Sequence, residues 1–356
     1  MNVDNLLKIM IEKRASDLHL RVGTCPVFRI DGKLVPFFDW PELTIENTFE
    51  IFDRIATPDQ REIFDREHDL DFAYSLPGVA RFRVSTLRQR GTLAFAIRLV
   101  PFVMPTIDQL GLPQICKDII HRPRGLVLVT GPAGSGKSTT ITAMIDYLNE
   151  TARRNIITIE EPIEYLHHNK QSIIAQRDMG DDTKTFDIAV VHALRQDPDV
   201  IFVGEMRDLN TISTGLRAAE TGHLVLSTLH TTDAPQTVDR IIDIFPASQQ
   251  EQVRTQLSQV LEAVLTQCLL PRLNGKGRIA AFEILLGTPA VRNLIRSGKS
   301  HEISNVMQLS AKDGMITLDQ SLAELVKNRE ITRENALMKS SNPKYLTKLL
   351  QYPTDV

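Results

Sequence analysis

Residues 131–138 constrain the fold of this 356-residue chain more than any other segment. They read GPAGSGKS and follow the apolar run GLVLVT at 125–130, and a helical pattern follows from Ser138 to Glu150. This is the G-x-x-x-x-G-K-[ST] pattern of a phosphate loop, in which a strand ends, a glycine-rich turn follows and a helix begins. The order predicts an α/β domain that binds a nucleoside triphosphate.

The residue types of the loop suit a polyphosphate. Glycines allow backbone N–H groups to turn inward around the anion, and the following helix adds the positive end of its dipole. The ammonium group of Lys137 is expected to reach the β- and γ-phosphates, and the Ser138 hydroxyl to hold Mg²⁺. The residues expected to bind the nucleotide are Gly131, Pro132, Ala133, Gly134, Ser135, Gly136, Lys137, Ser138 and Thr139.

Composition disfavours several other classes of protein. The net charge of −3 argues against a protein that coats nucleic acid or an anionic membrane through bulk charge. The three cysteines are scattered, with no C-x-x-C pair, which favours a reducing compartment without a cysteine zinc site. We find no signal-peptide pattern and no stretch approaching the roughly 18 apolar residues of a membrane span. The sequence therefore predicts a cytoplasmic protein.

The chain is expected to contain four regions. Residues 1–100 read as a small α+β domain of short strands and helices, and the proline-containing segment 101–112 reads as a linker. Residues 113–288 alternate apolar strands with helices, which is typical of a parallel sheet covered on both faces. In this region a helix is expected near Ser248–Leu269. Residues 289–356 are expected to be mostly helical.

Carboxylates follow two of the apolar strands. Val200–Val203 is followed by Glu205, which could reach Mg²⁺ through water or orient the attacking water; a solvated loop glutamate is the alternative. Glu160, Glu161 and Glu164 follow the strand before it, at the carboxyl edge where ligands of α/β sheets bind. We favour Glu164 over Glu205 as the general base for water. A solvated acidic turn is the alternative for this second cluster.

Two histidines, His223 and His230, flank the apolar strand Leu224–Leu229. No third imidazole or cysteine is nearby in the sequence, which disfavours a zinc site. A histidine at a strand end beside a nucleotide could sense the γ-phosphate by hydrogen bonding, and we expect this of His230. The alternative is a structural histidine that bonds to the backbone.

An arginine-rich segment, 79–107, contains no acidic residue. Arg81 and Arg83 lie in it, outside the region expected to hold the nucleotide. They could reach the triphosphate of a neighbouring subunit as arginine fingers, which is the role we favour. The alternatives are a solvated strand face or a nucleic-acid surface, and the latter lacks the aromatic platform expected of single-strand binders.

In this order, the segments resemble the type II/IV secretion ATPase superfamily, and within it the ATPases that retract type IV pili (the PilT family). The most specific segment is 194–208, LRQDPDVIFVGEMRD, which resembles the family signature around its Walker B glutamate, here Glu205. SDLHL at 16–20 resembles the N-terminal motif of the family. IEEPIE at 159–164 resembles its acidic box, and TGHLVLSTLHTTDA at 221–234 its histidine box.

The resemblance implies a PAS-like N-terminal domain and a RecA-like ATPase domain. It also implies ATP with Mg²⁺ at the subunit boundaries of a ring-shaped homohexamer, attached to the inner membrane through a pilus platform protein. The residues it assigns to catalysis are Glu164 and Glu205, with Arg81 and Arg83 in trans. The chain departs from the family at Glu161, where Asp is usual, and at Ala133, where Thr is commoner.

Two features favour pilus retraction over assembly within the superfamily. The chain lacks the long extra N-terminal region and the four-cysteine zinc module usual in assembly and type II secretion ATPases. Residues 290–296, AVRNLIR, resemble the motif associated with retraction. Thr288 is expected to cap this helix, and Arg292 and Arg296 to form a basic face that contributes little to folding. The alternative is that the helix simply packs.

Three other functions remain open at this stage. An accessory retraction ATPase (PilU-like) would need a paralogous pilus ATPase as its partner. A RecA-like nucleic-acid translocase would be stimulated by single-stranded DNA, and the acidic pI of 6.3 counts against it. A nucleotide-gated ring without turnover is disfavoured by the intact Lys137, Ser138 and Glu205.

Overall fold

The computed structural model describes residues 2–100, 104–275 and 277–351, and the chain divides into two compact units. The first comprises residues 1–103 and 163–166, and the second comprises residues 104–162 and 167–356. Part of the segment expected to be a linker, Ile107–Leu110, forms the helix α4 and belongs to the second unit. Residues 101–103 of that expected linker lie outside the described residues.

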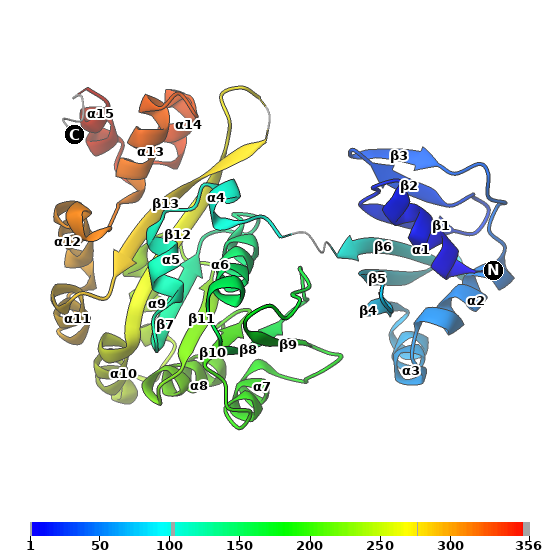
Figure 1. Ribbon diagram of the computed structural model, residues 1–356, viewed down its shortest axis with the longest axis horizontal. Helices are drawn as coiled ribbons and strands as arrows, with labels where there is room; N and C mark the ends of the chain where they lie inside the picture. The colour runs from blue at the N-terminus through cyan, green and yellow to red at the C-terminus, as the bar shows by residue number, and fades with distance from the viewer. Residues whose placement is uncertain (1, 101–103, 276, 352–356) are drawn as a thin grey trace. The chain divides into compact units, whose positions relative to one another are not determined.

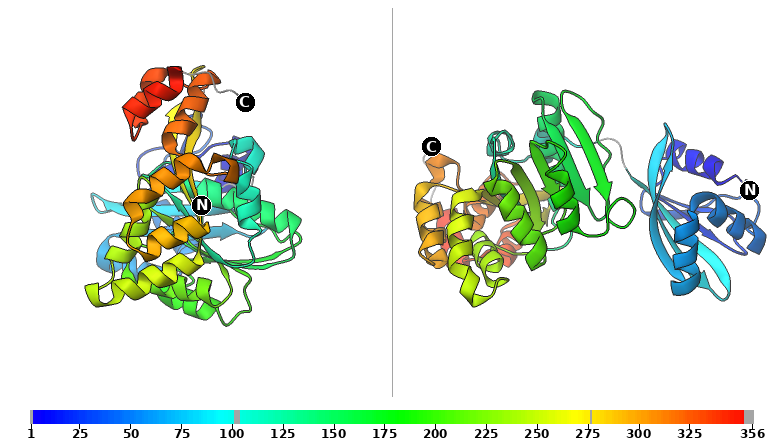
Figure 2. Two further views of the ribbon diagram at one scale, coloured as in Figure 1. Left: turned by 90° about the vertical axis from the view of Figure 1, so that its left-hand side faces the viewer. Right: turned by 90° about the horizontal axis from the view of Figure 1, so that it is seen from below.

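The first unit is an antiparallel sheet with helices against one face (Figures 1 and 2). The strand order is β3-β2-β1-β6-β5-β4. The strands are β1 (Asp17–Arg21), β2 (Val27–Ile30), β3 (Lys33–Pro36), β4 (Asp69–Leu76), β5 (Ala80–Gln89) and β6 (Thr92–Val100). The helices are α1 (Val3–Glu12), α2 (Ile45–Ile55) and α3 (Pro58–Glu67).

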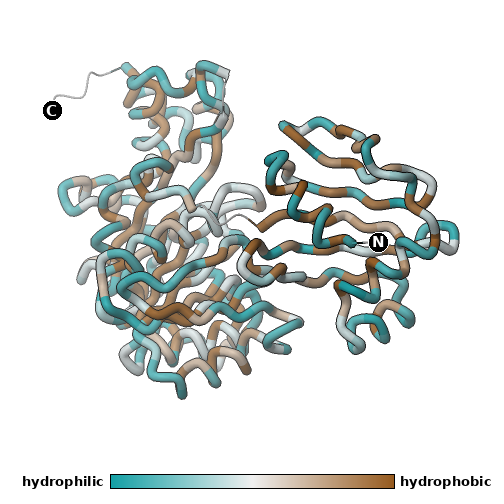
Figure 3. Tube along the Cα trace, turned by 45° about the vertical axis from the view of Figure 1, so that its right-hand side comes forward, coloured by the Kyte–Doolittle hydropathy of each residue, from teal (hydrophilic) through white to brown (hydrophobic). Residues whose placement is uncertain are grey.

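The sequence pattern explains why only one face of this sheet is covered. Hydrophobic and hydrophilic residues alternate along the strands (Figure 3), and in β5 Phe82 and Val84 are fully buried. Arg81 and Arg83 alternate with them and therefore lie on the opposite face of the sheet. Thr44 forms a capping box that starts α2. The first unit thus buries its own core and presents its arginines on the other side of β5.

The second unit is a seven-stranded sheet of order β13-β12-β7-β11-β10-β8-β9, parallel except for β13. Its strands are β7 (Gly125–Thr130), β8 (Asn155–Glu160), β9 (Ile173–Asp178), β10 (Val200–Val203), β11 (Leu224–Leu229), β12 (Leu261–Pro271) and β13 (Arg278–Leu286). Helices cover both faces, as predicted for strands that are apolar throughout. The α/β class is confirmed, with an antiparallel N-terminal sheet and a mostly parallel C-terminal one.

Alternate residues of each central strand enter two separate cores. Leu126 and Leu128 of β7 face a core formed with α7 (Phe186–Ala193), α8 (Leu209–Glu220), α9 (Ala234–Asp243) and α10 (Ala247–Val260). Val127 and Val129 face the other core, with α5 (Ile115–Ile120) and α6 (Lys137–Thr151). This double burial fixes the position of β7, and with it the loop that follows.

The prediction of one helix near Ser248–Leu269 is wrong. Helix α10 ends at Val260, and the next eleven residues form β12, which pairs with β7 in parallel and with β13 in antiparallel orientation. Most of β12 is buried on both faces, so its apolar run resembles a buried helix in sequence. Pairing with the partner strands decides between the two structures.

Residues beyond β13 are helical in most of their described part. The elements are α11 (Pro289–Arg296), the 3₁₀ turn Ser300–Glu302, α12 (Ile303–Leu309), the 3₁₀ turn Ala311–Asp313, α13 (Leu318–Lys327), α14 (Arg333–Lys339) and α15 (Pro343–Gln351). None of the described helices of the chain has the length and apolar character needed to span a membrane.

Helix α11 begins as predicted, because the Thr288 side chain accepts a hydrogen bond from the Val291 N–H, 3.5 Å away. The structure does not place Arg292 on an exposed basic face with Arg296, and its contacts argue against the expectation of little role in folding. The Arg292 guanidinium group donates to two backbone carbonyls in the last turn of α10 and to one between β13 and α11, and it pairs with Glu262. Arg296, one turn later, is exposed.

Candidate nucleotide-binding site

The phosphate loop connects β7 to α6 at the carboxyl edge of the sheet. Its backbone requires glycine at several positions, of which Gly131 and Gly136 are examples. A Cβ on Gly131 would lie 2.3 Å from the carbonyl oxygen of Gln267, and Gly136, the N-cap of α6, has φ 90°. An L-residue with a side chain is strained at that φ. The chain therefore closes tightly around the start of α6, with the helix N-terminus facing the loop.

Lys137 and Ser135 provide the polar groups inside the loop. The Lys137 ammonium donates to the carbonyl oxygens of Gly131 (2.8 Å) and Pro132 (3.1 Å), and the residue is only 8% exposed. The Ser135 hydroxyl is buried and has no hydrogen-bond partner among the described residues. A buried cation, an unsatisfied hydroxyl and glycine N–H groups suit a polyphosphate anion. The residues present fit the predicted nucleotide.

His230 lies between Lys137 and Glu205. Its Nδ1 is 3.5 Å from the Lys137 ammonium, and its Nε2 is 3.5 Å from Glu205 Oε1. Because an ammonium group can only donate, Nδ1 accepts and the proton of a neutral imidazole lies on Nε2, facing the carboxylate. The structure thus brings together three residues that the sequence predicted separately. His230 therefore connects the segment that follows β10, which carries Glu205, to the phosphate loop.

His223, at the other end of β11, has the structural role that the sequence left open. Its Nδ1 lies 3.0 Å from the carbonyl oxygen of Ala218 and 3.3 Å from the Thr221 hydroxyl. It therefore braces the end of α8.

The acidic box does not form a single cluster. Glu160 is buried and accepts hydrogen bonds from Thr158 (2.7 Å) and Gln176 (3.0 Å), and its burial raises its pKa. Glu161 is exposed and pairs with Arg207 at 3.4 Å. No group of three or more His, Cys, Asp or Glu residues in the described part of the chain is arranged to hold a metal ion.

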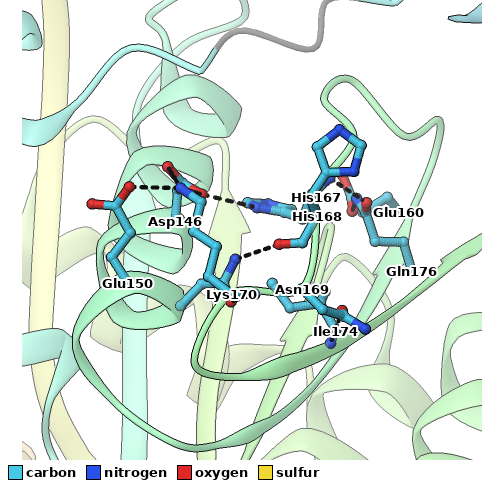
Figure 4. A network of polar contacts seen from close by, with 10 residues as sticks. Asp146, Glu150, Glu160, His167, His168, Asn169, Lys170, Ile174 and Gln176 are labelled. Carbon is cyan, nitrogen blue, oxygen red and sulfur yellow. Dashed lines mark hydrogen bonds and ion pairs between the residues drawn. The ribbon is translucent and has the colours of Figure 1, made fainter. Parts of the chain in front are cut away.

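A polar network beside the acidic box was not foreseen from the sequence (Figure 4). Asp146 of α6 accepts from Lys170 at 2.9 Å and lies 3.8 Å from Nδ1 of His167, whose side chain is almost fully buried. Lys170 also bonds to Glu150 at 2.6 Å. The network ties the helix that begins at Lys137 to the segment between β8 and β9.

Glu164, Arg81 and Arg83 lie in the first unit. Glu164 is exposed and belongs to the segment 163–166 that is grouped with that unit. Arg81 donates to the Ser75 hydroxyl at 3.2 Å, and Arg83 lies 3.8 Å from Asp71. The neighbouring strand β4 therefore supplies polar partners for both arginines, including an acid of the kind that the arginine-rich segment itself lacks. The catalytic roles of these residues stay predictions.

Sequence reasoning missed Gln267, which contacts the phosphate loop from β12. Its carboxamide Nε2 donates to the carbonyl oxygen of Ser135 at 2.6 Å, and the residue is 2% exposed. The neighbouring Thr266 hydroxyl lies 2.8 Å from that of Thr130, the last residue of β7. No sequence signal identified these residues, because the segment was predicted to be helical and lies about 130 positions from the loop.

Comparison with known proteins identifies the family. The family model described as type II/IV secretion system protein matches residues 1–339. The chain belongs to this family. The type IV pilus retraction ATPase PilT of Pseudomonas aeruginosa is 46% identical over 343 residues, which are 96% of this chain and 99% of that protein.

Two further members of the type II/IV secretion family are informative. The type IV pilus ATPase PilU of Pseudomonas aeruginosa is 42% identical over 337 residues, covering 95% of this chain and 88% of that protein. A crystal structure of the pilus retraction motor PilT with bound ADP superimposes with a TM-score of 0.90 at 47% identity. It covers 98% of this chain and 99% of that one. The likeness therefore includes both units as well as the phosphate loop.

Proposed function

We propose that this protein is an ATP-hydrolysing motor that retracts type IV pili and so supports twitching motility. The observation that carries the proposal is the near-complete match to a retraction ATPase at 46% identity, in a chain whose phosphate loop connects to Glu205 through His230. The motif AVRNLIR at 290–296 supports retraction over assembly.

In the proposed reaction, the Lys137 ammonium exchanges the two loop carbonyls for the β- and γ-phosphates of ATP, and His230 senses the γ-phosphate by hydrogen bonding. Ser138 and Glu205 would hold Mg²⁺, which neutralises phosphate charge when bound. Glu164 orients and deprotonates the attacking water. Arg81 and Arg83, as the resemblance implies, would stabilise the transferring phosphoryl group of a neighbouring subunit.

The trans role of the arginines requires an assembly. We propose a homohexamer that acts in the cytoplasm and binds an inner-membrane pilus platform protein. In this assembly residues 1–100 form the PAS-like domain, 113–288 the RecA-like core and 289–356 the helical region. The segment 101–112 links the two domains, and its helix α4 belongs to the second unit. Nucleic acid is not a proposed partner, because the net charge is −3.

The second candidate is an accessory retraction ATPase that works with a paralogous pilus ATPase. The 42% identity to PilU over 95% of the chain favours keeping it. The two candidates differ in what removal of the protein would do. For an accessory ATPase, its removal would stop retraction only under conditions where the paralogous pilus ATPase cannot retract pili by itself.

ATP hydrolysis by the purified full chain tests the proposal. Lys137→Ala should abolish productive nucleotide binding, because no other side-chain cation of the loop can neutralise the phosphates. Glu205→Gln should keep binding and lower turnover by about 100- to 10,000-fold. Glu220→Gln is the matched control, since this glutamate at the end of α8 bonds to Gln256 at 2.8 Å instead. Wild-type turnover in Glu205→Gln would contradict the assignment.

A further inference from the structure

Gln267 connects three parts of the phosphate loop from a strand that contributes no residue to the loop motif. Its backbone carbonyl packs against Gly131. Its side-chain amide nitrogen packs against Gly136 so closely that a Cβ on that glycine would lie only 3.0 Å from it. Its Nε2 donates to the Ser135 carbonyl at 2.6 Å, while its Oε1 accepts from the Thr140 hydroxyl at 2.9 Å.

The two hydrogen bonds fix the orientation of the amide. The Ser135 carbonyl can only accept, so the N–H end of the carboxamide must face it, which leaves Oε1 to accept from the Thr140 hydroxyl. Thr140 lies in the first turn of α6, so Gln267 ties the loop to the helix that follows it. A carboxamide, which carries a donor and an acceptor at this reach, satisfies both partners.

The anchored carbonyl determines where the next N–H points. The peptide bond between Ser135 and Gly136 is trans, because the Glu161-Pro162 bond is the only cis bond among the described residues. In a trans peptide the C=O and N–H groups point in opposite directions. Holding the Ser135 carbonyl outward, against β12, therefore aims the Gly136 N–H toward the inside of the loop, where the polyphosphate binds.

This segment would not hold that orientation by its own preferences. Gly134 and Gly136 flank Ser135, and both have positive φ. Glycine populates both signs of φ readily, so rotation of the intervening peptide costs little unless a partner restrains it. We propose that Gln267 is a positioning residue for nucleotide binding, which holds the Ser135–Gly136 peptide with its N–H toward the phosphates.

Gln267→Met in the full chain tests this role, because it keeps the length of the side chain and removes both hydrogen bonds. The dissociation constant for ADP should rise about tenfold, the effect of one lost hydrogen bond of ordinary strength. The KM for ATP should rise more than kcat falls. Thr266→Val is the matched control: it removes a buried hydrogen bond from the adjacent position of β12 without touching Ser135.

We expect Thr266→Val to lower the thermal midpoint without nucleotide by as much as Gln267→Met does. Its dissociation constant for ADP should stay within about threefold of the wild type. An equal loss of affinity in both variants, or none in Gln267→Met, would overturn the positioning role.

Gln267→Glu provides a second readout if Gln267→Met folds poorly. A protonated carboxyl at this site can donate to Ser135 and accept from Thr140, whereas a carboxylate faces the Ser135 carbonyl with no donor. The ratio of its ADP dissociation constant to that of the wild type should therefore fall as pH decreases from 8.5 to 6, about tenfold at most. A ratio independent of pH would overturn the argument.

This inference rests on the proposed nucleotide site, and its failure is distinguishable from failure of that site. If the wild-type protein neither binds ADP nor hydrolyses ATP, the proposed function fails. If the wild type binds ADP and Gln267→Met binds it equally well, only the positioning role fails.

Discussion

Arg292→Ala should destabilise the second unit, although the arginine lies on a short helix in a motif that the sequence associates with function. Its Nε donates to the Gly287 carbonyl at 2.7 Å, and its Nη1 donates to the carbonyls of Ser258 (2.9 Å) and Gln259. Its Nη2 bonds to the Glu262 carboxylate at 2.7 Å. Two of these carbonyls belong to the last turn of α10, where no backbone partner is available.

The magnitude follows from how accessible these partners are to water. A hydrogen bond to a charged group contributes about 1.5–3 kcal/mol net, and four such bonds would sum to more than one substitution usually costs. The Arg292 side chain is 25% exposed and that of Glu262 21%, so water can replace part of what is lost. We expect a loss of about 2–4 kcal/mol, which lowers the thermal midpoint by roughly 5–10 °C.

The assay is thermal unfolding of the purified full chain, followed by circular dichroism, with Arg296→Ala as the control. Arg296 is exposed on the same helix, four residues later, so its substitution should change stability by at most about 0.5 kcal/mol. Arg292→Lys should be intermediate, since an ammonium group cannot reproduce the planar fork. Equal midpoints for the two alanine variants would refute the reasoning.

Two further predictions follow from buried charge and from the proposed assembly. Burial raises the pKa of Glu283 from its ordinary value near 4.5 to about 7, so the folded protein binds an extra proton between these pH values and its stability falls as pH rises through them. At pH 8 the unfolding free energy of Glu283→Gln should therefore exceed that of the wild type by up to about 3 kcal/mol. This gain should vanish near pH 4.5. Urea unfolding at several pH values measures it, and a difference that does not change with pH would contradict the prediction. If Arg83 acts in trans, mixing Arg83→Ala with Lys137→Ala subunits should partly restore ATP hydrolysis, and mixed rings with no recovered turnover would count against that role.

Much of the nucleotide site could be predicted because its signals are local. The loop at 131–138 combines a strand, glycines and a helix within a short segment, and β10 and β11 read as apolar runs with chemical groups at their ends. Parallel strands bring those ends to one edge of the sheet. The approach of His230 to both Lys137 and Glu205 is therefore consistent with the predicted order of elements.

The support of the loop could not be predicted because it depends on long-range pairing. β12 approaches β7 only through strand pairing, and its sequence between 261 and 271 is as compatible with a buried helix as with a strand. Gln267 is chemically unremarkable until that pairing is known. The same holds for Arg292, two of whose three carbonyl partners lie more than 30 residues earlier, in α10. A charge pattern on a helix indicates which residues share a face, not whether backbone groups of another element meet that face.

The central claim is that ATP hydrolysis by this protein drives pilus retraction. The most direct measurement replaces the chromosomal gene with the Lys137→Ala version and determines the number of surface pili together with twitching motility. The account predicts that pili accumulate on the cell surface while motility is lost, and that the wild-type gene restores both. Cells without pili would indicate an assembly motor instead, and normal pili with normal motility would contradict the claim.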